Sequence, residues 1–508
     1  MQSYGELTRR EFLKLISLMP LGMYARPVSS LGRLANPGAN VIIIVFDAWS
    51  QQNVSLYGYP RHTMPNLEKF TENATVYHNH YSTGVFTVPG VSSLLTGLHP
   101  WSHRALQLGA GISQEHIPHT LFAAVSGTHS TLAYTQNKLA DQILYQMEAN
   151  LNQHPDAMLF DVQARHLYSA PSLRRDPRIS FASIDDNLIQ LGKGFDSSLF
   201  FGPLYRLSLM RNRMQINTQY GADYPRGLPQ TPAYFLMEDV VQGAIGLLEQ
   251  IQEPTLAYLH FWAPHEPYTP SKDFFGKFED GWKAPEKPVH ELSDEKSKLA
   301  KISLQRRFYD EYISNWDAEV ARLFQYLKES GLTENSYIII TADHGELFER
   351  GEIGHATRLL YDPVIHVPLL VLSPGQTHRE DVYTYTSSVD LVPTIAHLTG
   401  NPPPAWAEGT LLPGLGGVED MGRSIFSMEA RTNSSFGPLQ RFSISITRDG
   451  HRLVSYNYPN LDYQDFEFYD LQTDPQELKN LYPASPALAL DMKDELLQKI
   501  EEVNAPYR

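Results

Sequence analysis

The chain has 508 residues, 42% of them hydrophobic and 19% charged, which excludes general disorder and is more than one simple core usually holds. Its formal net charge of −16 excludes a broad nucleic-acid interface, because such an interface needs clustered Lys and Arg. The absence of cysteine excludes disulfides, thiolate metal sites and cysteine nucleophiles, so a metal ion that attracts an anionic substrate must be held by His, Asp, Glu, Asn or hydroxyl oxygen.

The N-terminal segment has the pattern of a twin-arginine export signal. Thr8–Lys14 contains the arginine pair, and the apolar stretch Leu15–Ala25 follows it. This stretch is too short and too interrupted to span a membrane. A basic, amphipathic first helix is the alternative interpretation. We expect residues 1–35 to bind the twin-arginine export machinery, and the protein to act in the periplasm, at the cell surface or outside the cell. Because Met23 stands where a cleavage site prefers a small residue, cleavage of the signal is left open.

Strand and helix patterns alternate over residues 36–400. Four apolar, β-branched runs predict buried strands, and two longer segments with helical periodicity lie among them. The strands are expected at residues 41–46, 256–262, 337–340 and 368–372, and the helices at residues 234–251 and 293–330. This alternation predicts an α/β catalytic domain with a mixed, mostly parallel sheet between helices.

Residues 150–230 interrupt this alternation. They are irregular and rich in Arg, Tyr, Phe and Pro, which predicts an insertion beside the site that contacts the substrate. A solvated, ion-paired surface explains the same composition equally well. The basic and aromatic residues in question include Arg174, Arg175, Arg178, Tyr205 and Arg206.

A proline-rich break, Asn401–Pro404, marks the end of the predicted catalytic domain. Strand patterns follow at residues 442–446 and 451–456, and a helical pattern follows at residues 487–503. Residues 401–508 are therefore expected to form a small α+β C-terminal subdomain.

Acidic residues directly follow two of the predicted strands. Asp47 comes after the first strand, and Asp343 with His344 comes after the strand at residues 337–340. Ligands of open α/β sheets collect at the carboxyl ends of the strands, so we expect these side chains to face one crevice. Taken alone, Asp47 is better explained as the cap of a helix or turn.

Thr87 begins a predicted helix that ends at Gly97. As the N-cap, its hydroxyl would accept a hydrogen bond from the helix backbone, and the free N–H groups at this end also suit an oxyanion. The capping role alone is the simpler explanation. Two histidines are further candidates: His265 lies between two prolines, and His355 lies downstream of His344. Neither would be singled out if the residues named above were absent.

Three further polar residues have simple structural explanations. Asn137 suits a turn or a hydrogen bond to a bound anion equally well. Asp310 and Asp317 lie within the predicted helix at residues 293–330 and are expected to be structural, because carboxylates on helices usually cap or form ion pairs.

Eight short motifs, in their order along the chain, resemble those of the sulfatase family of the alkaline phosphatase superfamily. They are Val45–Asp47, Ser55–Tyr59, Pro65–Leu67, Ser93–Gly97, Pro264–Pro267, Thr341–Glu346, His366–Leu370 and Phe468–Pro475 with Asn480–Leu481. The resemblance extends from about Asn40 to the end, apart from residues 150–230, and implies an alkaline phosphatase-like fold. It also implies a metal bound by two acids, a histidine and the nucleophile. The matching positions are Asp47, Asp343, His344 and Thr87.

Two departures from the family pattern bear on the chemistry. Sulfatases use a formylglycine, matured from cysteine or serine, where this chain has Thr87, and the Ser and Arg that close their motif are Gly90 and Val91 here. Sulfatases also carry a second Asp where this chain has Ala48. A formylglycine hydrate expels sulfate by collapsing to the aldehyde, a route that threonine lacks. The pattern therefore resembles the threonine-dependent, manganese-using phosphonate hydrolases and phosphoglycerol or phosphoethanolamine transferases of the superfamily.

The resemblance thus implies a metal-dependent hydrolase or transferase that cleaves a phosphate-type anionic ester: a phosphodiester, a phosphomonoester or a phosphonate. Thr87 would attack in line and become esterified, while His265 and His355 neutralise the equatorial oxygens or protonate the leaving group. Asn137 would add a hydrogen bond to the anion.

One divalent ion is expected, with manganese favoured and calcium, magnesium and zinc as alternatives. A sulfuric ester hydrolase without formylglycine is the enzymatic alternative. A catalytically silent binding protein on the same scaffold is the other alternative, although all four matching residues are present.

Overall fold

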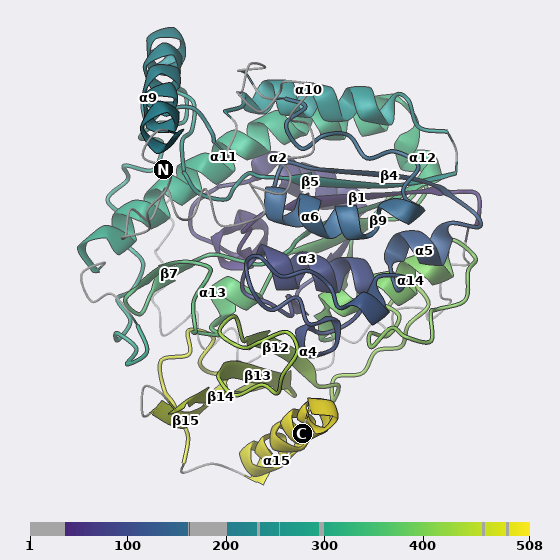
Figure 1. Cartoon of the computed structure of the whole chain (residues 1–508), viewed down its shortest axis with the longest axis vertical. Helices are drawn as coiled ribbons and strands as arrows, with labels where there is room; N and C mark the ends of the chain where they lie inside the picture. Colours follow the sequence, from purple (N-terminus) through teal and green to yellow (C-terminus); the bar gives the residue numbers. More distant parts are fainter. Residues whose placement is uncertain are drawn as a thin grey trace, which may run out of the picture.

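The computed structural model describes residues 36–160, 162, 201–230, 234–252, 254–293, 299–459, 463–483 and 487–507. The expected export signal, together with Arg174, Arg175 and Arg178, lies outside these residues. Within them, a seven-stranded sheet with helices on both faces forms the centre of the protein, and a four-stranded sheet lies beside it (Figure 1).

The central sheet has the strand order β10-β2-β9-β6-β1-β5-β4. Its strands are β1 (Asn40–Phe46), β2 (Thr75–Tyr77), β4 (Ser130–Thr135), β5 (Thr255–Phe261), β6 (Ser336–Ala342), β9 (Leu369–Leu372) and β10 (Glu380–Val382). Strands β6, β1, β5 and β4 pair in parallel, whereas β9 is antiparallel to both of its neighbours. The sheet is therefore mixed and mostly parallel, which confirms the expected fold class.

Two short pairs of strands flank this sheet. They are β3 (His80–Tyr81) with β11 (Thr386–Ser387), and β7 (Leu347–Glu349) with β8 (Glu352–Gly354). The described helices are α2 (Pro65–Phe70), α3 (Thr87–Thr96), α4 (Pro100–His103), α5 (Leu121–Val125), α6 (Lys138–Gln146), α9 (Phe201–Tyr220), α10 (Met237–Leu248), α11 (Leu299–Glu329), α12 (Leu332–Asn335), α13 (Asp362–Ile365), α14 (Leu391–Leu398) and α15 (Ala487–Asn504).

Side chains alternate along β1 between two hydrophobic cores. Val41, Ile43 and Val45 pack with α3, α5, α6 and α14 on one face of the sheet. The intervening residues pack with α2, α10 and α11 on the other face. Because both faces are buried, the strand is apolar from Val41 to Phe46, as its continuous β-branched run predicts. Asp47 continues the odd-numbered series and therefore lies on the α3 side.

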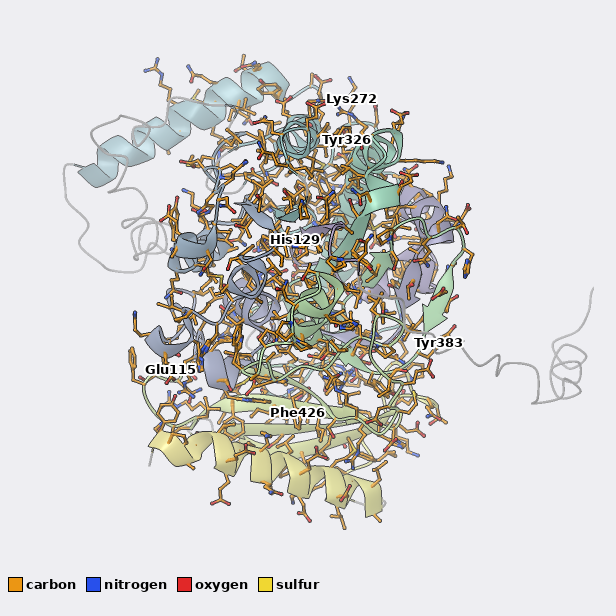
Figure 2. All side chains as sticks on the ribbon, turned by 90° about the vertical axis from the view of Figure 1, so that its right-hand side faces the viewer. Glu115, His129, Lys272, Tyr326, Tyr383 and Phe426 are labelled. Atoms are coloured by element: carbon orange, nitrogen blue, oxygen red, sulfur yellow. The ribbon has the colours of Figure 1, made fainter. Side chains whose placement is uncertain are left out.

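The segment 201–220 differs from the prediction of irregular structure. It forms the 20-residue helix α9, because after its first residues it is built mainly from good helix formers such as Leu, Arg, Met and Gln. The helix projects from the body of the protein in two perpendicular views (Figures 1 and 2). Tyr205 and Arg206 belong to it, and their contact with a substrate stays a prediction. Among the helices that the structure describes, none has the length and apolar character needed to cross a membrane.

The C-terminal part contains an antiparallel sheet of β12 (Ile425–Glu429), β13 (Phe442–Arg448), β14 (His451–Tyr458) and β15 (Tyr463–Asp470). Helix α15 packs on it through a separate hydrophobic core. The predicted strands at 442–446 and 451–456 and the predicted helix at 487–503 are confirmed as β13, β14 and α15. Strands β12 and β15 were not predicted.

This C-terminal sheet docks on the chain around α3 and α4. The Met428 N–H donates to the Thr83 carbonyl at 2.9 Å, and the Ser427 hydroxyl donates to the Ser82 carbonyl at 2.6 Å. Phe426, labelled in Figure 2, packs edge-on against Trp101 with ring centroids 5.6 Å apart. The strand β12 therefore supports the loop that leads into α3.

Candidate active site

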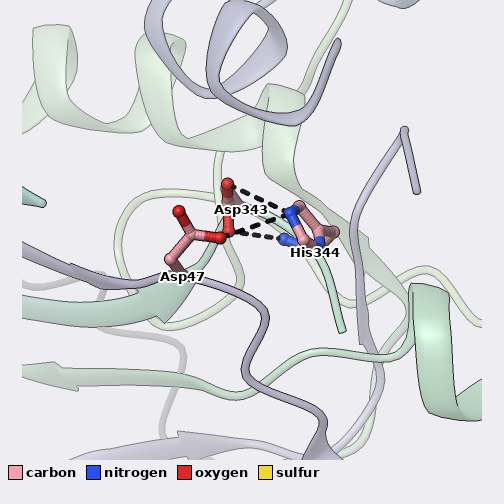
Figure 3. A group of neighbouring side chains, drawn as sticks. All are labelled: Asp47, Asp343 and His344. Atoms are coloured by element: carbon pink, nitrogen blue, oxygen red, sulfur yellow. Dashed lines mark hydrogen bonds and ion pairs between the residues drawn. The ribbon is translucent and has the colours of Figure 1, made fainter. Parts of the chain in front are cut away.

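Sheet geometry brings Asp47 and Asp343 together. Phe46 of β1 pairs with Ala342 of β6, so the next residue of each strand leaves the sheet at the same edge. His344 follows directly, and its Nε2 lies 3.4 Å from Asp47 Oδ1 and 3.5 Å from Asp343 Oδ2 (Figure 3). The ligand-type atoms of the three side chains lie within 4.8 Å of one another. The three side chains therefore lie together at this edge of the sheet, as the strand pairing predicts.

The donor atoms of this group fit a divalent cation. Asp47 Oδ1, Asp343 Oδ2 and His344 Nε2 are buried and have no hydrogen-bond partner among the described residues. Buried polar atoms without partners are rare, and carboxylate oxygens with an imidazole nitrogen form a common ligand set for divalent metals. In the described part of the chain, both carboxylates form ion pairs with imidazoles and not with Lys or Arg. A bound cation would satisfy all three atoms.

Protonation in this group follows from burial and close charges. Burial and then the charge of Asp47 raise the pKa of Asp343 to about 7. Burial opposes ionisation of Asp47, but the imidazoles of His265, His344 and His260 outweigh it and hold the pKa of Asp47 below its usual value. Burial alone would lower the pKa of His344, but Asp343 and Asp47 raise it to about 9. A metal must therefore displace protons from Asp343 and His344 near neutral pH.

Thr87 is the first residue of α3 and does not cap it. Phe86 occupies the N-cap position, and no side chain makes a capping hydrogen bond there. The predicted N-cap role of Thr87 is therefore wrong, because the hydrogen bond from the Gly90 N–H to the Phe86 carbonyl (3.2 Å) starts the helix one residue earlier. The predicted end at Gly97 is confirmed by its left-handed conformation, with φ of 71°.

The side-chain amide of Asn137 joins Thr87 to Asp47. Its Nδ2 donates to Asp47 Oδ2 at 2.6 Å and to Thr87 Oγ1 at 3.1 Å. Its Oδ1 accepts the Leu139 N–H at 2.8 Å and caps α6. The structural role expected of Asn137 is therefore filled by Oδ1, whereas Nδ2 contacts Asp47 and Thr87. Because the amide is the donor, the Thr87 hydroxyl keeps its own proton for another partner.

Gly90 allows α3 to approach the end of β6. A Cβ atom at this position would lie 2.3 Å from the Asp343 carbonyl oxygen, closer than real Cβ atoms come to backbone. Any larger residue would push the first turn of α3, and with it Thr87, away from Asp343. The glycine that departs from the sulfatase pattern therefore has a packing reason here.

His265 and His355 extend the group outward from His344. The ring centroids of His344 and His355 are 4.4 Å apart, and those of His355 and His265 are 4.7 Å apart. Glu346 Oε2 lies at hydrogen-bonding distance, 3.1 Å, from His355 Nδ1, so this contact engages Nδ1 and leaves His355 Nε2 for a ligand. Burial, followed by the charges of His344 and His265, holds the pKa of His355 well below its usual value.

Two residues of this group were not predicted from the sequence. His260 on β5 is fully buried, with its Nε2 3.5 Å from Asp47 Oδ2 and 3.9 Å from Asp343 Oδ2. Glu346 orients His355, as described above. A histidine near the end of an otherwise apolar strand was the available signal for His260. Glu346 lies in a motif that was noticed, but its partner is set by the turn between β7 and β8.

Asp310 and Asp317 have the structural partners expected of them. Asp310 accepts hydrogen bonds from side chains that include Arg61, whose Nη1 lies 2.7 Å away. Asp317 accepts the backbone N–H groups of Asn66 and Leu67, each at 2.9 Å, and so caps α2. Neither carboxylate belongs to the candidate metal-binding group of Asp47, Asp343 and His344.

The chain matches known families over most of its length. The family model described as Sulfatase matches residues 39–401, and the model described as N-sulphoglucosamine sulphohydrolase, C-terminal, matches residues 351–505. The multifunctional alkaline phosphatase superfamily protein PehA of Trinickia caryophylli is 24% identical over 90% of this chain and 94% of its own length. A choline-sulfatase of Rhizobium meliloti (strain 1021) is 28% identical over 46% of this chain and 47% of its own length.

Solved structures share the fold. The phosphonate monoester hydrolase of Agrobacterium radiobacter aligns with a TM-score of 0.62 at 19% identity, over 92% of this chain and 96% of its own. At this identity the likeness concerns the fold, which agrees with the one expected from the motifs.

Proposed function

This chain belongs to the sulfatase family of hydrolases, and from that membership we propose that it cleaves a phosphate-type ester through a covalent bond to Thr87. One observation carries the proposal: the Thr87 hydroxyl does not cap its helix, and it shares the Asn137 amide with Asp47. Since threonine cannot collapse to an aldehyde, its ester must be cleared by attack at phosphorus or sulfur. Known relatives include proteins named for both phosphonate and sulfate esters.

In this proposal Thr87 is the nucleophile and Asn137 Nδ2 orients its oxygen. Asp47, Asp343 and His344 would hold a divalent cation, whose positive charge would attract the anion and favour loss of the Thr87 hydroxyl proton to solvent water, from which Thr87 later regains it. As the Oγ1–P bond forms, the ester P–O bond breaks in line, which leaves Thr87 phosphorylated.

The row of imidazoles serves the leaving group in the same scheme. His265 or His355 donates a proton to the departing oxygen. At His355 the negative charge of the substrate favours the protonated imidazole and opposes the effect of burial on its pKa. Glu346 holds His355 in position. Water or an acceptor alcohol then attacks phosphorus, gives its proton to an imidazole, and releases Thr87, which regains its proton.

A panel of nitrophenyl esters tests the substrate class. The phosphate monoester, phosphate diester, phosphonate and sulfate are each tried with manganese, calcium and zinc. We expect the phosphorus esters to be turned over faster than the sulfate, and manganese to give the highest rate, because Ala48 removes a carboxylate of the kind that calcium sites use. Thr87→Ala protein, prepared in parallel, corrects for contaminating phosphatases.

Turnover of the sulfate alone would instead support a sulfuric ester hydrolase that works without formylglycine. If none of the esters is turned over with any of the three metals, the catalytic proposal loses its support and the silent binding protein becomes the better description.

We also propose that the protein is exported by the twin-arginine route. The arginine pair within Thr8–Lys14 supports this proposal. Cell fractionation should find the protein outside the cytoplasm, and replacement of Arg9 and Arg10 by lysine should retain it inside. Unchanged distribution of that variant would contradict the proposal.

A further inference from the structure

The imidazole of His260 faces both carboxylates of the candidate metal site from the neighbouring strand β5. His260 pairs with Val45 of β1 and with Thr135 of β4, one residue before β5 ends. Its Nε2 approaches Asp47 through Oδ2, at 3.5 Å, whereas His344 Nε2 approaches through Oδ1, at 3.4 Å. The two imidazoles therefore approach Asp47 through different oxygens.

Burial leaves His260 Nε2 without another partner. The side chain is fully buried, and this nitrogen makes no hydrogen bond within the described part of the chain. Its distances to the two carboxylates are longer than those of good hydrogen bonds, which lie near 2.9 Å. An unpartnered buried nitrogen is destabilising, so a ligand between the carboxylates would remove this cost.

Thr135 determines which nitrogen of His260 faces the site. Thr135 Oγ1 lies 3.2 Å from His260 Nδ1. The same oxygen accepts the Asn137 N–H at 3.0 Å, and its hydroxyl donates to the Asn137 carbonyl at 3.5 Å. When the Thr135 hydroxyl proton is turned to that carbonyl, its oxygen can accept the ring proton of His260 Nδ1. Nε2 then presents a lone pair to the carboxylates, and such a supporting hydrogen bond is usual for a metal-ligating histidine.

We propose that His260 Nε2 is a metal ligand alongside Asp47, Asp343 and His344. This inference rests on the metal site of the proposed function and specifies which ions it selects. A second imidazole changes a mainly oxygen donor set into a mixed one, which favours transition metal ions, zinc among them, over calcium and magnesium. Ala48 offers no carboxylate beside Asp47, and β5 supplies a nitrogen instead.

Proton NMR of the cobalt(II)-loaded full-length protein tests this ligand directly. A ligating imidazole whose other nitrogen carries a proton gives one strongly shifted, solvent-exchangeable signal. Two such signals are expected, one from His260 and one from His344, whose Nδ1 donates to the Gly345 carbonyl at 3.0 Å. His260→Gln should remove one signal.

A matched control is His103→Gln, which removes another fully buried imidazole, one that contacts Ser93 Oγ at 3.0 Å, away from the carboxylates. This variant should keep both signals. A single signal in both the wild type and His260→Gln would overturn the proposal, because a histidine that only orients Asp47 gives no such signal.

Metal affinity gives a second readout. Calorimetric titration of metal-free protein should show zinc affinity reduced about tenfold or more in His260→Gln, with calcium affinity changed less than about threefold. Equal losses for both ions would contradict the proposal, since loss of a merely orienting contact weakens every ion alike. The melting temperature of the metal-free variant checks that it folds. A wild type that binds none of manganese, calcium, zinc and cobalt would refute the metal site of the proposed function itself, whereas binding with one imidazole signal refutes only this inference.

Discussion

Replacing Thr87 by alanine should give a folded protein whose turnover falls at least about a thousandfold. The hydroxyl is the proposed nucleophile, and no other group can form the same ester. Stability should fall by only about 1 to 2 kcal/mol, because Thr87 makes no capping bond and the substitution removes a methyl group and one hydrogen bond to Asn137. Steady-state kinetics and thermal unfolding of the same preparation measure the two effects.

Thr87→Ser is the matched control, because it keeps the hydroxyl and should retain part of the activity. Mass spectrometry after reaction with a slow substrate should find an added phosphoryl group on the peptide that contains Thr87. A Thr87→Ala protein that is less stable yet nearly fully active would mean that water, and not Thr87, attacks the substrate.

Asp343→Asn should abolish turnover and also remove the stabilisation that metal gives. At a hundredfold excess of metal over its Kd, the wild type should gain about 2.7 kcal/mol, and the variant almost none. Without metal, we expect a different ranking of the stabilities of the wild type and the variant. The pKa of Asp343 rises from its usual 3.8 to about 7, so between these values the folded state holds a proton that the unfolded chain has released. Metal-free stability therefore falls as pH rises through this window and stays reduced above it.

At pH 8 with chelator, the Asp343→Asn protein lacks this unfavourable charge and should be at least as stable as the wild type. Asp310→Asn is the control, since Asp310 is also fully buried but accepts from Arg61 and is not one of the three candidate metal ligands. That variant should be less stable with chelator and should still gain stability with metal. A metal-dependent gain retained by Asp343→Asn would contradict the assignment of Asp343 as a ligand. Thermal unfolding with and without metal measures all three proteins.

Much of the fold could be predicted because the buried strands are unusually uniform. The runs around Val45 and Ile339 have no polar residue to interrupt them, so their positions were evident, and parallel pairing then brings Asp47 and Asp343 to one edge. The short strands β2 and β10 carry too few residues for a periodic pattern, and their place in the sheet depends on contacts far along the chain.

Less of the candidate site could be predicted from the sequence, because its geometry depends on the directions in which side chains point. A helix start was evident at Thr87, but whether its hydroxyl caps the helix depends on a shift of one residue, which the Gly90 to Phe86 hydrogen bond sets. His260 gave no motif, since its relation to Asp47 exists only through strand pairing. Periodicity places strands well, but it does not reveal which polar atoms they bring together.

The docking of β12 on the loop before α3 has a consequence for biosynthesis. All the candidate catalytic side chains precede residue 356, yet the carbonyls of Ser82 and Thr83 accept hydrogen bonds from Ser427 and Met428, much later in the chain. Until β12 has emerged from the ribosome, the loop that leads into Thr87 lacks this support. Thr87 would therefore reach its final position late in synthesis, after the strands that carry Asp47 and Asp343 have already emerged.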